Sequence, residues 1–279
     1  MSRGLDDVRV GFLGGGAMGE ALAAGVLAAG ASRERVCAAD PDPARRKQLE
    51  QALGIAAGSD NASVVEASDL VVLAVKPALV AGLLAALGGP GERALARPLW
   101  VSIAAGIPLT TLAGALPPGA RIVRAMPNTP ALVRAGATAF VASASCTGAD
   151  RALARTLFEA VGIAWEAPAE ALLDAVTGLS GSGPAYVFVF LEALSDAGVR
   201  MGLPRDAASA LATQTVLGAA RLAQETGRHP AALKDQVTSP GGTTIAGLER
   251  LEAHGFRAAV HEAVAAATRR AKELGGPAA

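Results

Sequence analysis

Three glycines at fixed spacing are the first residues in this chain that could do chemistry. The segment Gly14-Gly15-Gly16-Ala17-Met18-Gly19 matches the pattern G-x-G-x-x-G. Gly14 would permit a tight turn, Gly16 would let a pyrophosphate approach the backbone, and Gly19 would let a helix pack close to a strand. An apolar run, Val8–Leu13, precedes the segment, and a helix-compatible stretch whose first amides could face phosphates follows it. The segment predicts a dinucleotide-binding turn.

A carboxylate and a basic cluster give opposite indications about the dinucleotide. Asp40 lies 21 residues beyond Gly19, at the end of a second expected strand. A carboxylate at this place binds the ribose hydroxyls and repels the extra phosphate of NADP. Arg45, Arg46 and Lys47 follow closely and either favour that phosphate or form a solvated helix face. NADPH and NADH both stay open as the cofactor.

A second loop has the composition of an anion receptor. Ser239-Pro240-Gly241-Gly242-Thr243-Thr244 leads into an expected helix, Ile245–Glu252. Backbone amides at a helix start, together with hydroxyl groups, can receive a carboxylate. A helix cap needs only one Ser or Thr, so the surplus favours a ligand. A further segment of small and hydroxyl-bearing residues, Thr177–Pro184, also stands out as more than a connector, although a simple loop that caps the next helix would have the same composition.

Alternating strands and helices must position the glycine turn. The expected strands are mostly apolar and do not alternate with polar residues, which indicates a parallel sheet covered on both faces. They are Val8–Leu13, Arg35–Asp40, Leu70–Val75, Trp100–Ile103, Arg121–Met126 and Ala137–Val141, with early helices at Glu20–Ala29 and Ala44–Leu53. The sequence predicts an α/β fold in which a Rossmann-type doubly wound sheet occupies residues 1–165.

The second half of the chain has helical rather than strand periodicity. Helices are expected at Ala185–Val199, Arg205–Thr226 and Ala258–Leu274. The apolar run Val187–Phe190 is interpreted as buried helix because good helix formers continue it. Small residues along 205–226 favour close packing against a second subunit. Residues 166–279 are therefore predicted to be an all-helical domain for substrate binding and dimerisation.

Composition and charge exclude several classes of protein. A hydrophobic content of 51% argues against disorder, and 25 basic residues balance 25 acidic ones, which leaves no field for nucleic acid. The longest apolar stretch, Leu70–Leu87, is interrupted by Lys76-Pro77, so no membrane span is expected. The first residues lack a signal-peptide pattern, and Cys37 and Cys146 have no metal-motif spacing. We expect a cytoplasmic protein that binds a small-molecule substrate and no metal.

Longer motifs give the chain a family resemblance from about Val8 to Leu274. It resembles the pyrroline-5-carboxylate reductases. The most specific segment is Pro230–Glu252, which contains TSPGGTT, and further matches are AVKP at 74–77, SIAAG at 102–106, MPNTP at 126–130 and DAVTGLSGSGPAY at 174–186. The resemblance implies reduction of 1-pyrroline-5-carboxylate to L-proline with NADPH or NADH. It also implies a homodimer formed through C-terminal helices, often assembled as five dimers.

The resemblance also implies roles for individual residues. Residues expected to contact the dinucleotide are Leu13, Gly14, Gly15, Gly16, Ala17, Met18, Gly19, Asp40, Asn61, Val75, Lys76, Pro77, Ala104, Ala105 and Asn128, with Gln236 contributed by a partner subunit. Residues expected to contact substrate are Glu170, Ser239, Gly241, Gly242, Thr243 and Thr244. Thr244 is our candidate catalytic residue, orienting the ring nitrogen. Asp40 departs from relatives that carry Ser or Thr there.

Three alternative functions make different demands on the sequence. A related 3-hydroxyacid dehydrogenase would need a Lys four residues after its second glycine motif, but Val187 stands four residues after Gly183. A reductase of another imine would differ only in the shape of its pocket. A non-catalytic dinucleotide sensor would leave the loop at 239–244 unexplained. The scattered His229, His254 and His261 suggest no catalytic cluster, and a protonated C=N bond requires no strong acid from the protein.

Overall fold

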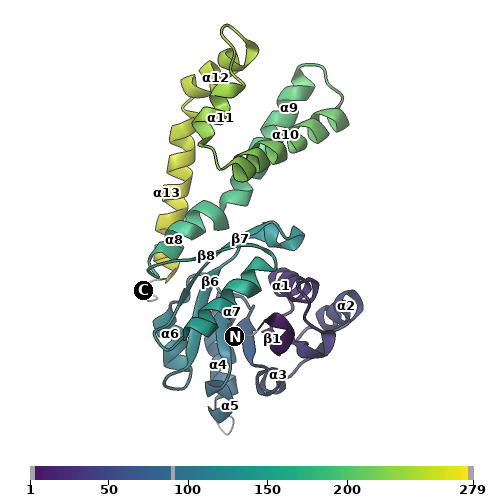
Figure 1. Cartoon of the computed structure of the whole chain (residues 1–279), viewed down its shortest axis with the longest axis vertical. Coiled ribbons are helices and arrows are strands. Elements are labelled where there is room, and N and C mark those ends of the chain that lie inside the picture. The colour runs from purple at the N-terminus through teal and green to yellow at the C-terminus, as the bar shows by residue number, and fades with distance from the viewer. Residues whose placement is uncertain (1–3, 89–91, 276–279) are drawn as a thin grey trace. The chain divides into compact units, whose positions relative to one another are not determined.

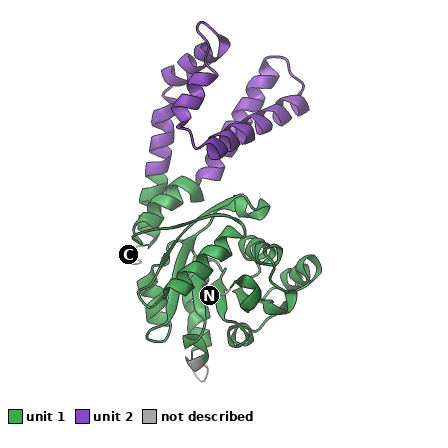
Figure 2. Ribbon diagram, viewed as in Figure 1, with its two compact units in different colours: residues 1–182, 266–279 green, residues 183–265 purple. Residues whose placement is uncertain are grey.

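The computed structural model describes residues 4–88 and 92–275, which form parts of two compact units (Figures 1 and 2). Unit 1 is Met1–Ser182 with Ala266–Ala279, and unit 2 is Gly183–Ala265. This division falls later than the domain boundary expected at residue 165. The segment after the last strand stays with unit 1 because Leu173 is buried against Ala139 and Ala167 of the sheet region.

Eight strands of the described residues form one sheet in unit 1, in the order β3-β2-β1-β4-β5-β6-β7-β8. Their bounds are β1 Val10–Leu13, β2 Val36–Ala39, β3 Ala56–Gly58, β4 Leu70–Leu73, β5 Leu99–Ser102, β6 Arg121–Met126, β7 Gly136–Ala142 and β8 Gly162–Glu166. The α/β doubly wound fold is confirmed. Strands β3 and β8 were not expected, since β3 is a three-residue stretch of Ala and Gly and β8 alternates in exposure instead of forming a buried run.

The prediction of a wholly parallel sheet is wrong at β7. This strand pairs antiparallel with β6, and β8 pairs parallel with β7. A parallel pair needs a crossover of a dozen or more residues, whereas an antiparallel pair needs only a short connection. Between β6 and β7 the chain has a single short 3₁₀ turn, Thr129–Val133, so the strand direction reverses.

Helices cover both faces of the sheet in unit 1 (Figure 1). They are α1 Ala17–Ala28, α2 Pro43–Leu53, α3 Asn61–Ala67, α4 Pro77–Leu87, α5 Glu92–Ala96, α6 Leu109–Ala115, α7 Gly148–Glu159 and α8 Leu172–Val176, with 3₁₀ turns at Leu5–Asp7 and Arg33–Arg35. One buried cluster contains Phe12 and Phe158, and another contains Leu73 and Trp100. Trp100 is fully buried and donates its indole N–H to the carbonyl of Leu95 (2.8 Å). The buried indole nitrogen therefore has a hydrogen-bond partner.

Unit 2 consists of helices, as the periodicity predicts. Its elements are α9 Gly183–Arg200, α10 Arg205–Thr226, α11 Pro230–Gln236 and α12 Thr243–Ala253, and α13 Phe256–Gly275 continues into unit 1. The segment Thr177–Pro184 is not the expected loop. Residues Thr177–Gly181 form one π-helical turn between α8 and α9, closed by the Ser182 amide on the Thr177 carbonyl (2.8 Å).

The run Val187–Phe190 is helical, as expected, but it is not buried within the chain. Phe188 is 63% exposed and Val189 is 66% exposed. Among the described residues of unit 2, only Ser195, Ala208 and Ala212 are buried. An apolar helix surface of this extent is usually buried against another element. The other helices of unit 2 do not bury it.

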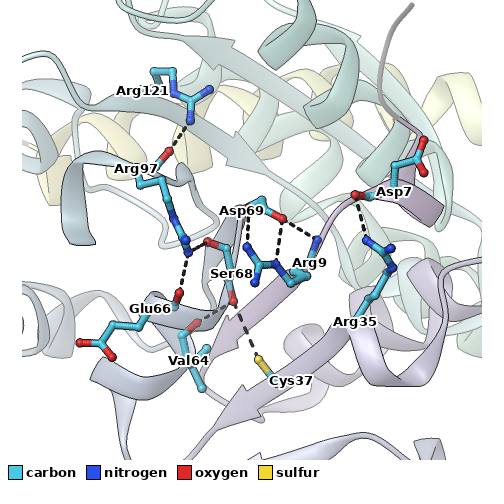
Figure 3. Close-up of polar contacts among 10 residues, drawn as sticks. All are labelled: Asp7, Arg9, Arg35, Cys37, Val64, Glu66, Ser68, Asp69, Arg97 and Arg121. Atoms are coloured by element: carbon cyan, nitrogen blue, oxygen red, sulfur yellow. Dashed lines mark hydrogen bonds and ion pairs between the residues drawn. The ribbon is translucent and has the colours of Figure 1, made fainter. Parts of the chain in front are cut away.

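A polar network occupies the amino-terminal edge of the sheet (Figure 3). Arg9 donates to both carboxylate oxygens of Asp69 (3.1 and 3.2 Å), which lowers the pKa of Asp69. Arg97 donates to the carbonyls of Glu66 and Ser68 (2.6 and 2.7 Å). The guanidinium groups of Arg9 and Arg97 are thus hydrogen-bonded to neighbouring groups of the chain. We interpret this edge of the sheet as structural.

Two further observations concern the environment of the chain. Both cysteines are unpaired, and burial raises the pKa of the Cys37 thiol. No helix within the described ranges is both long and apolar enough to cross a membrane.

Candidate active site

The sheet has a topological switch point at the carboxyl ends of β1 and β4. From β1 the chain builds outward through β2 and β3, and then returns to the other side of β1 with β4. Open α/β sheets bind ligands at such a switch point. The Gly14 amide donates to the Ala39 carbonyl and the Ala74 amide to the Leu13 carbonyl, both at 2.8 Å. These bonds bring the glycine segment, the end of β2 and the start of the segment after β4 to one edge.

The glycine segment has the geometry that its spacing predicts. Gly14 has φ +104°, and a Cβ there would lie 2.7 Å from the Ala74 carbonyl oxygen. A Cβ at Gly19 would collide with the Gly14 carbonyl, which explains the close approach of α1 to the turn. A Cβ at Gly16 would meet nothing within 4 Å. The turn is therefore closed where the backbone packs and open where a ligand would approach.

The amino terminus of α1 offers donors beside this open position. Its Ncap is Gly16, and the Glu20 amide donates to the Gly16 carbonyl (2.9 Å). The amides of Ala17, Met18 and Gly19 precede that first helical bond, and such first-turn amides have no acceptor within their own helix. Together with the helix dipole they suit an anionic pyrophosphate. The residues present thus fit a dinucleotide.

Asp40 lies at the end of β2 and is fixed by backbone amides. Its Oδ2 accepts the Gly15 amide (2.7 Å), and its Oδ1 accepts the Asp42 amide (2.9 Å). The Gly15 bond ties the carboxylate directly to the glycine segment. The predicted ribose contact would therefore come from a carboxylate that is already oriented.

Two of the basic residues after Asp40, Arg45 and Arg46, have partners within the chain. Arg45 donates to Gln48 (2.8 Å) and lies 3.8 Å from the Glu20 carboxylate. Arg46 donates to the carbonyls of Asp40 and of the following residue (2.8 and 2.9 Å). The Arg46 guanidinium thus helps to hold the loop after β2, whereas Arg45 connects side chains on α2 and α1.

The other residues predicted to contact the dinucleotide lie at or near the same edge, with one distinct case. Val75, Lys76 and Pro77 follow β4, Ala104 and Ala105 follow β5, and Asn61 begins α3 after β3. Asn128, in contrast, is buried, and its side chain joins two parts of unit 1. It donates to the Ser180 carbonyl (3.0 Å) and accepts the Ala137 amide (2.8 Å). Its contact with the dinucleotide stays a prediction.

Glu170 takes part in a polar cluster that the sequence reasoning missed. Its Oε1 accepts the Arg124 guanidinium (2.7 Å) and the Leu109 amide (2.8 Å). Arg124 lies on β6 and is only 8% exposed. The available signal was an arginine placed between the apolar Val123 and Ala125, because a charge inside an apolar strand requires a partner.

The loop at 239–244 belongs to unit 2 and forms a tight turn before α12. The Gly242 amide donates to the Ser239 carbonyl (3.1 Å), and Gly241 has φ +67°. With Pro240 at its second position, this is the pattern of a type II turn. Thr243 and Thr244 are the first residues of α12, and Gly242 caps the helix without a side-chain acceptor. The loop is thus a tight turn that leads directly into a helix, and its contact with substrate stays a prediction. Gln236 is exposed at the end of α11.

Comparison with known proteins identifies the family. Residues 9–106 match the model described as NADP oxidoreductase coenzyme F420-dependent, and residues 170–274 match pyrroline-5-carboxylate reductase dimerisation. A curated pyrroline-5-carboxylate reductase of Synechocystis is 48% identical over 96% of this chain and 98% of its own length. This chain belongs to the pyrroline-5-carboxylate reductase family. It is accordingly an NAD(P)H-dependent oxidoreductase, and its helical C-terminal region supports homodimer formation.

Other relatives give the same result across the whole chain. The reductase of Methanosarcina acetivorans is 46% identical, with 97% of this chain and 99% of that protein covered. The solved reductase of Coxiella burnetii has a TM-score of 0.90 at 36% identity, covering 97% of this chain and 99% of that one. The Plasmodium falciparum enzyme, solved with NADP bound, has a TM-score of 0.86 at 32% identity, covering 98% and 100%.

Proposed function

We propose that this chain transfers a hydride from NAD(P)H to the C=N bond of 1-pyrroline-5-carboxylate and so forms L-proline, the final step of proline biosynthesis. The observation that carries the proposal is the family match over nearly the full length, including the loop at 239–244. Val187 stands where the rival 3-hydroxyacid dehydrogenases need a lysine, which disfavours alcohol chemistry.

The residues of the chain divide the work of this reaction. A bound NAD(P)H supplies the hydride. The glycine segment and the first amides of α1 hold the pyrophosphate. The amides of Gly241, Gly242 and Thr243 receive the substrate carboxylate, with Ser239 closing the turn. The Thr244 hydroxyl orients the ring nitrogen, which keeps its proton while the imine carbon gains the hydride. The protein thus contributes position and charge stabilisation rather than a strong acid.

The direct test is turnover by the purified protein. The substrate 1-pyrroline-5-carboxylate is mixed with NADH or NADPH, and the fall in nicotinamide absorbance is followed. We expect turnover that depends on both components and exceeds turnover of the six-membered ring homologue. Preferential reduction of the six-membered ring would indicate a different imine reductase, and absence of turnover with every imine would support the non-catalytic alternative.

Asp40 should give NADH the higher kcat/KM. Its carboxylate is held by the amides of Gly15 and Asp42, so it cannot readily turn away from a 2′-phosphate. Arg45 and Arg46 are engaged with neighbouring groups. A strong preference for NADPH in the same steady-state assay would contradict this role.

Thr244→Ala tests the assigned catalytic hydroxyl. Loss of one polar contact of this kind costs about 100-fold in kcat. Thr244→Ser is the matched control, because it keeps the hydroxyl and should retain most of the activity. Equal kcat and KM in the wild type and Thr244→Ala would remove Thr244 from the mechanism.

The assembly and location are part of the proposal. The match to a dimerisation domain supports a homodimer through the C-terminal helices, and we extend this to a decamer of five dimers in which Gln236 reaches the partner's dinucleotide. Light scattering of the purified protein tests the assembly. We place the protein in the cytoplasm, without nucleic-acid or membrane partners, because the charges balance and the cysteines are unpaired.

A further inference from the structure

Arg124 is a nearly buried charge with a single carboxylate partner. It is 8% exposed, and among the described residues Glu170 is the only acidic group that forms an ion pair with it. A buried charge is costly unless it is paired, so the Arg124 side chain and the Glu170 carboxylate constrain one another.

The two hydrogen bonds that Glu170 accepts share one oxygen atom. Oε1 accepts the Arg124 guanidinium at 2.7 Å and the Leu109 amide at 2.8 Å. The other oxygen, Oε2, has no hydrogen-bond partner among the described residues. The carboxylate is thus fixed by one oxygen and leaves the second available for a ligand, while its side chain stays 29% exposed.

We propose that Arg124 is a positioning residue that orients Glu170 so that Oε2 faces the ring nitrogen of the substrate. This inference rests on the proposed function, in which Glu170 contacts the substrate. A protonated imine nitrogen is attracted to a carboxylate, whereas the substrate's own carboxylate is repelled by it. The oriented Glu170 therefore favours one placement of the ring over its reverse.

The same cluster connects the substrate contact to the loop after β5. Leu109 is the first residue of α6, directly after the loop that contains Ala104 and Ala105. In this loop Gly106 has φ +76°, and a Cβ there would lie 3.4 Å from the Leu274 carbonyl. Packing on one side and the Glu170 bond on the other fix this loop, so Arg124 indirectly sets the substrate contact relative to residues predicted to bind the dinucleotide.

Arg124→Met is the test, with Arg121→Met as the matched control. Arg121 lies on the same strand and also donates to a carboxylate at 2.7 Å, that of Asp150, but at the opposite end of β6. We expect Arg124→Met to raise KM for 1-pyrroline-5-carboxylate by about 10- to 100-fold, the usual range for a charged hydrogen bond. The KM for the nicotinamide should change less than about twofold. Arg121→Met should leave both KM values near those of the wild type.

A second variant covers the case in which Arg124→Met does not fold. Arg124→Lys keeps the positive charge but not the planar donor geometry, and should give an intermediate KM. In Arg124→Ala, added guanidinium ions should lower the raised KM, which a general loss of stability would not produce.

The possible results separate the two proposals. Suppose that the wild type reduces 1-pyrroline-5-carboxylate and that the KM for this substrate in Arg124→Met is the same as in Arg121→Met. The positioning role is then overturned and the proposed function stands. If the wild type shows no turnover with this imine, the proposed function itself fails and the positioning role fails with it. A raised substrate KM confined to the Arg124 variants supports both.

Discussion

Unit 1 and unit 2 differ in how far their large apolar side chains are buried. In unit 1, helices cover both faces of the sheet, and Phe12, Trp100 and Phe158 are at most 1% exposed. In unit 2, Phe188 and Val189 are more than half exposed, and the buried side chains are small. One unit completes its core within the chain, whereas the other leaves its largest apolar surfaces open.

This difference shows which part of the chain depends on assembly. Exposed apolar surface of this extent indicates an interaction site. The family's dimerisation domain covers the same helices, α9 to α13. We therefore expect the core of unit 2 to be completed between two chains.

The largest effect is expected from a substitution that creates a cavity in the core of unit 1. Phe158 is fully buried and contacts Phe140, with ring centroids 5.9 Å apart. Phe158→Ala should lower the free energy of unfolding by about 3–5 kcal/mol, measured by urea denaturation. Leu132→Ala, at a site that is 55% exposed in the same unit, is the control and should cost less than about 0.5 kcal/mol. Similar costs at both sites would contradict the sealed core.

The next effect concerns the open surface of unit 2. Phe188→Asp places a charge on a face that the dimer should bury, and should weaken dimer association by about 100-fold or more. Leu79→Asp is the control, since Leu79 is 57% exposed in unit 1 and outside that face. Sedimentation at several protein concentrations measures both. If Phe188→Asp remains as dimeric as the control, the contrast between the units is broken.

The smallest effect concerns the polar edge of unit 1. Arg9 lowers the pKa of Asp69, so the ionised form stabilises the folded state above the ordinary pKa of a carboxyl group, and this stabilisation is lost as the pH falls through the lowered value. Asp69→Asn should lower Tm slightly at neutral pH and have a diminishing effect on acidification. Asp6→Asn is the control outside the network. A difference between Asp69→Asn and the wild type that does not change with pH would exclude this ion pair as the cause.

Local patterns were sufficient for most of the elements and for the turns. The glycine segment, the strands near it and helix α10 have residues whose preferences and neighbours agree. The turn at 239–242 is likewise local, because Pro240 and Gly241 suit its geometry. The reversal of β7 was missed because the apolar pattern of a strand does not give its direction; the available signal was the short connection, since residues 127–135 are too few for a parallel crossover.

The sequence by itself determined the glycine turn, the carboxylate after β2, the helical character of the second half and the family. Only the tertiary structure decided that Arg124 meets Glu170, 46 residues away, and that the apolar residues of α9 remain uncovered in one chain. The physical reason is that turns and helices depend on neighbouring residues, whereas charge pairing and burial depend on groups that only folding or assembly brings together.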